Sequence, residues 1–158
     1  MKTSELKLAE STKYLFTDFF DTLIYRKCHP EEIKRKWCAR IIDVFDIKIE
    51  TNNLYRLRLQ CEAEICEVNL NLFGEGEFKY SELLNLLHAQ LQKQFNICVD
   101  RSLFFEIAET IELSIEKDNQ LVNTDELDFI IKERSFGKVV IVVSDFYMSG
   151  WFVQELRS

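Results

Sequence analysis

The sequence predicts an α/β fold that is mostly helical by residue count, with a small parallel sheet and an inserted all-helical subdomain. Two short apolar segments, residues 14–19 and 138–143, are rich in β-favouring side chains and end in polar residues. Residues 30–117 between them instead place apolar side chains at helical spacing. A single proline and four glycines in 158 residues favour long helices with few tight turns.

The two predicted strands share one profile. Tyr14 to Phe19 is a short β-favouring run that carries Thr17 and Asp18 at its end, as expected of a buried parallel strand that delivers polar groups at its carboxyl edge. Lys138 to Val143 is almost all valine and isoleucine and is followed by Ser144. Because it is apolar on both faces, we expect an interior strand covered by helices on each side.

Four amphipathic helices are predicted between these strands, each with apolar residues three and four positions apart. Their apolar positions are Ile33, Trp37, Ile41, Val44 and Phe45; Leu54, Leu57, Cys61, Ile65 and Val68; Leu84, Leu87, Leu91 and Phe95; and Phe104, Ile107, Ala108, Ile111 and Ile115. Such stripes can be buried only against one another or against another layer. We therefore expect a helical subdomain over residues 29–118 and an α/β core formed by residues 1–28 and 119–158.

A short helix is predicted immediately before the second strand. Thr124 is its expected N-cap, and Gly137 can close it. After the second strand, Ser149 and Gly150 open a final predicted helix that runs through Leu156.

Composition and charge exclude several functional classes. A net charge of -7 repels nucleic acid and anionic lipid, so we expect neither a nucleic-acid partner nor a membrane partner. The longest apolar run, Val139 to Val143, is far too short to cross a bilayer, and the N-terminus lacks the apolar centre of a signal peptide. These features predict a cytoplasmic protein.

Five cysteines without a CxxC pair argue against a disulfide framework and against a zinc knuckle. We expect reduced and mostly buried thiols. Cys28, His29 and Cys38 leave a zinc site open as an alternative to helix-packing cysteines. His88, which lies among leucines at helical spacing, is expected in the core or at its boundary.

Two strings resemble motifs of the haloacid dehalogenase-like (HAD) superfamily of hydrolases. YLFTDFFDTLIYR is similar to the first motif, whose first aspartate is the nucleophile and whose Thr-Leu pair follows; these are Asp18, Thr22 and Leu23 here. VVIVVSDFYMSG is similar to the second motif, whose Ser or Thr hydrogen-bonds the transferred phosphoryl group; this is Ser144. The predicted helical insertion resembles the family's cap. The plainer interpretation makes Asp18 and Asp21 turn or capping acids and Ser144 a capping hydroxyl.

The resemblance implies an incomplete Rossmann-like sheet and a phosphatase that acts on a small phosphorylated molecule through an aspartyl-phosphate. By resemblance, Asp18 and the backbone carbonyl of Phe20 would bind Mg2+, a hard ion that screens the negative charges. Phosphate contacts would come from Thr22, Ser144 and Asp145.

Two departures from the family pattern argue against efficient catalysis. Phe20 occupies the position of the family's general acid, and phenylalanine cannot transfer a proton; Asp21, one residue later, is the candidate substitute. The family's third motif, a lysine, and its fourth, an acidic pair, lie downstream of the second motif, whereas the sequence ends at Ser158. Lys138 and Arg157 are poor substitutes for the missing lysine because both lie within or too near the second motif. We therefore expect weak or absent Mg2+ binding and negligible turnover by this chain alone. A non-catalytic interaction module derived from the HAD fold is the alternative.

An incomplete sheet has a further consequence. The free edge of the first strand is an association hazard, so the chain is expected to form a homodimer, to bind a missing C-terminal segment, or to be a truncation. Four cations, Arg26, Lys27, Arg56 and Arg58, either face an anionic substrate or are solvated helix charges.

Overall fold

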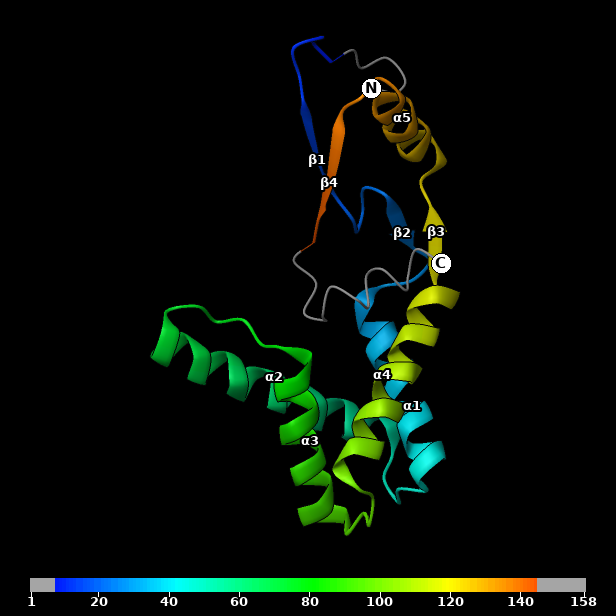
Figure 1. Cartoon of the computed structure of the whole chain (residues 1–158). Coiled ribbons are helices and arrows are strands. Elements are labelled where there is room, and N and C mark those ends of the chain that lie inside the picture. Colours follow the sequence, from blue (N-terminus) through cyan, green and yellow to red (C-terminus); the bar gives the residue numbers. More distant parts are fainter. Residues whose placement is uncertain (1–7, 145–158) are drawn as a thin grey trace. The chain divides into compact units, whose positions relative to one another are not determined.

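The computed structural model describes residues 8–144, which divide into two compact units. Residues 8–28 and 119–144 form the first unit, and residues 29–118 form the second. Figure 1 shows the elements of both units in chain order by colour. Asp145 and residues 149–156, for which a final helix was predicted, lie outside the described residues.

The first unit contains a two-stranded parallel sheet. Strand β1 (Tyr14–Asp18) pairs with β4 (Val139–Val143), and the register runs from Tyr14 opposite Val139 to Asp18 opposite Val143. The two strands lie side by side in Figure 1, in blue and orange. Helix α5 (Thr124–Ser135) precedes β4 and packs against it. Together with the helices of the second unit, this sheet confirms the predicted α/β class with mostly helical content.

One face of this sheet differs from the prediction. Tyr14, Phe16, Val139 and Val143 share a face in the parallel register, and their side chains are 59%, 65%, 51% and 52% exposed. The prediction of an interior strand covered on both sides is therefore wrong for the described part of the chain. The physical reason is that α5 packs on this sheet while the described residues supply no layer for the opposite face.

A second pair of strands was not predicted. β2 (Ile24–Arg26) and β3 (Gln120–Val122) are antiparallel, with Ile24 opposite Val122. The Lys27 N–H donates to the carbonyl of Asn119 at 2.7 Å, which extends the pairing by one step. This ribbon holds together the two points at which the chain leaves and re-enters the first unit.

Helix α5 begins at Thr124, which was its predicted cap, and the observed cap is one residue earlier. The side chain of Asn123, not that of Thr124, caps the helix by accepting the Glu126 N–H at 3.4 Å. Asn123 is the cap instead of Thr124 because it directly precedes the helix, where its amide oxygen can accept a free N–H of the first turn. Gly137 does end this region as expected, in a left-handed conformation with φ 83°.

The second unit consists of four helices, which agree with the four predicted. They are α1 (Pro30–Phe45), α2 (Thr51–Phe73), α3 (Tyr80–Phe95) and α4 (Arg101–Asp118). Pro30 starts α1 because its fixed φ suits the first helical position, and the His29 side chain accepts the Glu31 N–H there. Among the described residues, no helix is both long enough and apolar enough to cross a bilayer.

The core of this unit is mostly apolar, but it contains a buried charge network around Arg58, and His88 and Glu116 are buried as well. Its fully buried apolar side chains come from all four helices: Ile33, Trp37, Ile41, Leu54, Leu83, Leu84, Leu87, Leu91 and Phe104. Arg58 lies among them with no exposed surface. Both predictions for Arg58, a substrate contact and a solvated charge, are therefore wrong; Arg56, by contrast, is exposed.

Arg58 is stabilised by carboxylates from two helices. Its guanidinium donates to both oxygens of Glu112 at 2.9 and 3.2 Å, and its Nε donates to Glu62 at 3.0 Å. The Tyr80 hydroxyl donates to Glu112 at 3.0 Å, and the Arg58 guanidinium lies 4.6 Å from the Trp37 ring centroid. Such pairing and hydrogen bonding are what a buried arginine requires.

Cys38, Cys61 and His88 complete this core. Cys38 and Cys61 are buried, Cys28 and Cys66 are half-buried and Cys98 is exposed, so the thiols are less uniformly buried than predicted. Burial raises the pKa of Cys38 to about 12 and that of Cys61 to about 11. His88 is buried, as expected, with Nε2 2.9 Å from the carbonyl oxygen of Val99.

Candidate functional site

The predicted catalytic residues gather at the carboxyl edge of the β1–β4 sheet. Asp18 is the last residue of β1, and Ser144 directly follows β4. Because Asp18 is opposite Val143 in the register, Ser144 is only one residue beyond the position that faces Asp18. In open α/β sheets, the carboxyl ends of parallel strands are the usual place for ligands. Asp145, a predicted phosphate contact, lies outside the described residues.

The Asp18 carboxylate is accessible and locally oriented. The residue is exposed, and its Oδ1 accepts the Phe19 N–H at 2.7 Å. The same N–H also donates to the carbonyl of Val143 at 3.1 Å, so the backbone pairing of the two strands continues past Asp18. An exposed carboxylate held against a rigid strand end can meet an incoming electrophile with little reorganisation.

A tight loop follows Asp18. The carbonyl of Phe19 accepts the N–H groups of Leu23 and Ile24 at 3.0 and 3.1 Å, and the Asp21 N–H donates to Ile24 at 2.8 Å. Asp21 sits at the tip in a left-handed conformation, φ 58°, which aspartate tolerates better than most residues. The structure thus brings Asp18 and Asp21 into one short loop, with Asp21 exposed at its turn.

Phe20 anchors this loop through its side chain. It is 8% exposed and packs edge-to-face on Phe19, with ring centroids 5.1 Å apart and planes at 86°. The Arg26 guanidinium also lies 3.9 Å from the Phe20 ring centroid, within cation–π range. Of the four cations considered in the sequence, Arg26 is thus placed beside the loop that carries the predicted site.

The residue that sequence reasoning missed is Asn123. Its Nδ2 donates to the carbonyl of Thr22 at 2.8 Å and to the hydroxyl of Tyr25 at 2.9 Å. Its backbone N–H donates to the carbonyl of Leu23 at 2.9 Å, while its Oδ1 caps α5. Asn123 therefore connects the loop after Asp18 to the helix before β4. The capping signal near residue 124 was visible in the sequence, but the contact with Thr22 was not.

The donor atoms of the site set its metal chemistry. Among the described residues, no three His, Cys, Asp or Glu side chains gather in a way that could hold a metal ion, the zinc alternative at Cys28, His29 and Cys38 included. Asp18 does supply one hard carboxylate oxygen, the ligand type that Mg2+ prefers. Mg2+ commonly takes its other ligands from substrate phosphate and water, so with Asp18 as the one carboxylate an ion would be held only together with a bound phosphate.

The chain matches no family model and no curated protein sequence. The resemblance to HAD hydrolases consequently rests on the motif strings of the sequence alone.

Proposed function

We propose that the first unit is the phosphoryl-transfer core of a HAD-like hydrolase that acts on a small phosphorylated molecule. The parallel pairing of β1 with β4 is the single observation that carries this proposal, because it supports Asp18 and Ser144 at the same sheet edge. The helical unit is inserted between these two strands in the sequence, which is the arrangement expected of a cap.

The proposed chemistry has two steps. An oxygen of the Asp18 carboxylate attacks phosphorus, the bond from phosphorus to the leaving oxygen breaks, and that oxygen takes up a proton. Water then attacks the aspartyl-phosphate, which releases inorganic phosphate and restores the Asp18 carboxylate. The Ser144 hydroxyl would donate to a phosphoryl oxygen, and Thr22 would support the loop from its position beside Asp21. When bound, Mg2+ would neutralise charge shared by Asp18 and the phosphate.

Proton transfer is the weak step in this scheme. Phe20 occupies the general-acid position and is buried under Arg26, so Asp21 is the carboxyl group left in the loop to protonate the leaving oxygen. We therefore propose formation of the phosphoryl adduct with slow turnover.

Adduct formation on Asp18 tests the proposal. The full chain is mixed with beryllofluoride and Mg2+, and the bound fluoride is observed by 19F NMR. We expect a bound signal for the wild type and for Asp43→Asn, an exposed control on α1, and none for Asp18→Asn. A signal that survives Asp18→Asn, or no signal from the wild type, would contradict the assignment of Asp18 as nucleophile.

A non-catalytic module is the second candidate, and the placement of Phe20 favours it. A side chain that packs on both Phe19 and Arg26 has a structural role at the position where the family carries its acid. If that candidate is right, the wild type forms no beryllofluoride adduct, and Asp18→Asn preserves the fold and any partner binding.

A further inference from the structure

The second half of α2 is not part of the helical core. Its last buried residue is Glu62, and no residue from 63 to 79 is buried. Val68, Leu70, Leu72 and Phe73 are 47%, 56%, 69% and 74% exposed. In Figure 1, the green end of α2 extends beyond the helices against which its first half packs. Four large exposed apolar side chains within six consecutive residues, fewer than two helical turns, are unusual for a surface without a partner.

A groove lies between this part of α2 and helix α3. Its volume is about 450 Å3, within the range of roughly 300–1,000 Å3 typical of binding clefts. Ile65 and Val68 of α2 and Leu86 of α3 supply its apolar lining. Ile65, Val68 and Leu72 follow one another at positions i, i+3 and i+7, so they form one stripe along α2. The groove thus has the apolar helix face that accepts another amphipathic helix.

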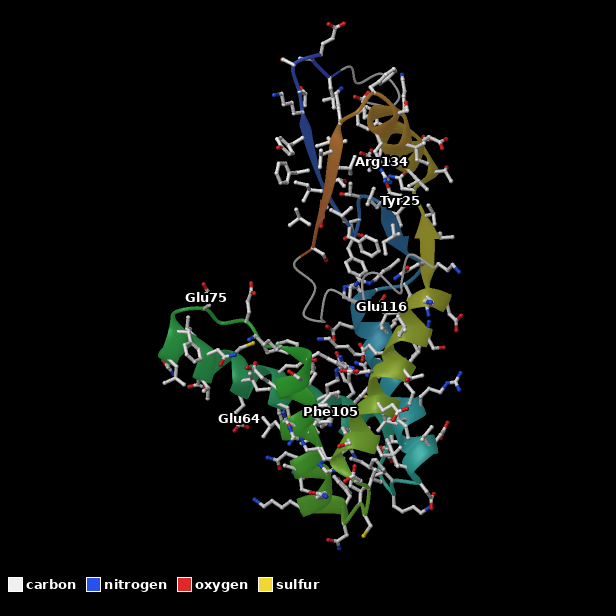
Figure 2. The ribbon with its side chains drawn as sticks, in the orientation of Figure 1. Tyr25, Glu64, Glu75, Phe105, Glu116 and Arg134 are labelled. Atoms are coloured by element: carbon white, nitrogen blue, oxygen red, sulfur yellow. The ribbon has the colours of Figure 1, made fainter. Side chains whose placement is uncertain are left out.

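The surroundings of this groove are acidic. Residues 59–86 contain six glutamates, one lysine and no arginine or aspartate. Glu64 and Glu82 line the groove itself, and Glu75 and Glu77 line a neighbouring hollow of about 340 Å3 beside Phe73. Figure 2 shows Glu64 and Glu75 extending away from the ribbon.

The glutamates that line the groove and the neighbouring hollow have no ion-pair partner among the residues that the structure describes. Across residues 8–144, Glu64, Glu67, Glu75 and Glu77 form no ion pair. Glu82 accepts the Lys79 N–H at 2.9 Å and an Asn69 amide N–H at 3.3 Å, neither of which removes its charge. A ligand for this surface must therefore combine apolar side chains with positive charge.

We propose that the groove between Ile65, Val68 and Leu86 binds a basic amphipathic helix of a partner protein. Leucine-like side chains of that helix would fill the groove, and its lysines or arginines would pair with Glu64 and the neighbouring glutamates. Charge complementarity selects this occupant. A second copy of the chain carries a net charge of -7, and an anionic lipid surface is negative as well, so the acidic rim repels both.

Fluorescence anisotropy of the full chain with a defined probe tests this proposal. The probe is a labelled peptide of about 18 residues, five helical turns, made of leucine and lysine at amphipathic helical spacing. We expect binding in the micromolar range that weakens as salt is raised, because the rim contacts are electrostatic. A peptide with glutamate in place of lysine should not bind.

Matched variants locate the site. Val68→Ser and Glu64→Lys should each weaken binding about tenfold, whereas Val44→Ser and Glu106→Lys, exposed positions on α1 and α4, should leave it within about twofold. Circular dichroism checks that all four variants keep their helical content. Equal losses in all four would mean non-specific attraction and would overturn the proposal. It would also be overturned by the absence of binding, or by a wild-type dimer in light scattering that Val68→Ser converts to monomer.

Discussion

Asn123 makes three contacts with its side chain, in addition to the hydrogen bond from its backbone N–H to Leu23. It caps α5, holds the carbonyl of Thr22 and contacts the hydroxyl of Tyr25. Asparagine suits this position because its amide carries both a donor and an acceptor, so it can serve a helix end and a loop together. The geometry of the loop after Asp18 consequently depends on a residue about one hundred positions away in the sequence.

Replacement of Asn123 should therefore cost stability. We expect Asn123→Ala to lower the free energy of unfolding by about 1–2 kcal/mol, through loss of the cap and of a partly buried hydrogen bond. Urea denaturation followed by circular dichroism measures this change. Thr124→Ala is the matched control, because the exposed Thr124 was the predicted cap but does not cap the helix. Equal losses in the two variants would contradict the role given to Asn123.

Phe20 offers a test of the missing proton donor. If the proposed function is right, Phe20→Asp should raise the hydrolysis of p-nitrophenyl phosphate on the order of 10²-fold, because a carboxyl group can protonate the leaving oxygen. Phe20→Asn serves as the control, because asparagine has nearly the same shape as aspartate but no acidic proton. The loss of contacts with Phe19 and Arg26 should destabilise both variants similarly. Equal activity of the two variants would rule out the general-acid interpretation.

At the level of elements, the two halves of α2 differ in their surroundings. Its first half delivers Arg58 into the core, where Glu112 of α4 and Glu62 of α2 neutralise it, while its second half remains outside the core. The buried pair joins helices that are distant in sequence. Its directional hydrogen bonds restrict how α2 and α4 can slide past each other, a constraint that apolar contacts alone do not impose.

Arg58→Met should be strongly destabilising. It leaves Glu112 as a buried carboxylate without its cation, and removal of one partner from a buried pair typically costs about 3–5 kcal/mol. Chemical denaturation provides the measurement. Lys48→Met, which breaks the fully solvated Lys48–Asp46 pair, should cause little change. A small effect of Arg58→Met would show that the core rearranges around the lost charge.

The buried thiols predict loss of stability at alkaline pH. The folded-state pKa values of Cys38 and Cys61 are raised by burial to about 12 and 11 from 9.0, so their contribution is fully present below pH 9. As pH rises above 9, the unfolded thiols lose protons that the folded ones retain, which should lower stability by at most about 1.4 kcal/mol per pH unit for each thiol.

Denaturation at a series of pH values from 8 to about 11 checks this dependence. Cys38→Ala should make the decline shallower, whatever its effect on stability at neutral pH. Cys98→Ala should retain the wild-type slope because Cys98 is exposed. An identical slope for Cys38→Ala and the wild type would refute the role of the buried thiol.

For the molecule as a whole, the division into two units has a testable consequence. The helical unit has its own core around Trp37 and Phe104. Just before and just after this unit in the sequence, the Lys27 N–H donates to the Asn119 carbonyl at 2.7 Å, which holds the two ends of the insertion together. We expect residues 29–118 produced alone to fold, with a helical circular-dichroism spectrum and cooperative unfolding. A disordered spectrum would mean that this core requires the remainder of the chain.

Much of the secondary structure was predictable because its signals are local. Helix α1 spans Pro30–Phe45 as expected, since proline, two glutamates and the apolar spacing all act within a few turns. The three-residue strands β2 and β3 were missed because so short a segment carries no measurable alternation. Their pairing is decided by residues far apart in the chain.

The candidate site was predictable only in part. Asp18 and Ser144 could be named from motif strings, and hydrophobic strands that end in polar groups suggested that they share a sheet edge. The contacts of Phe20 with Arg26 and of Asn123 with Thr22 could not be inferred, because they join side chains whose directions depend on the folded loop.

The amino-acid sequence by itself determined the α/β class, the four helices of the insertion and the two longer strands, since apolar periodicity and end signals act over short distances. Only the tertiary structure decided that Arg58 is buried, that one face of the β1–β4 sheet is exposed and that the end of α2 leaves an acidic groove. The physical reason is that burial depends on which surfaces meet. A residue's own type and its near neighbours do not specify the partner it meets in space.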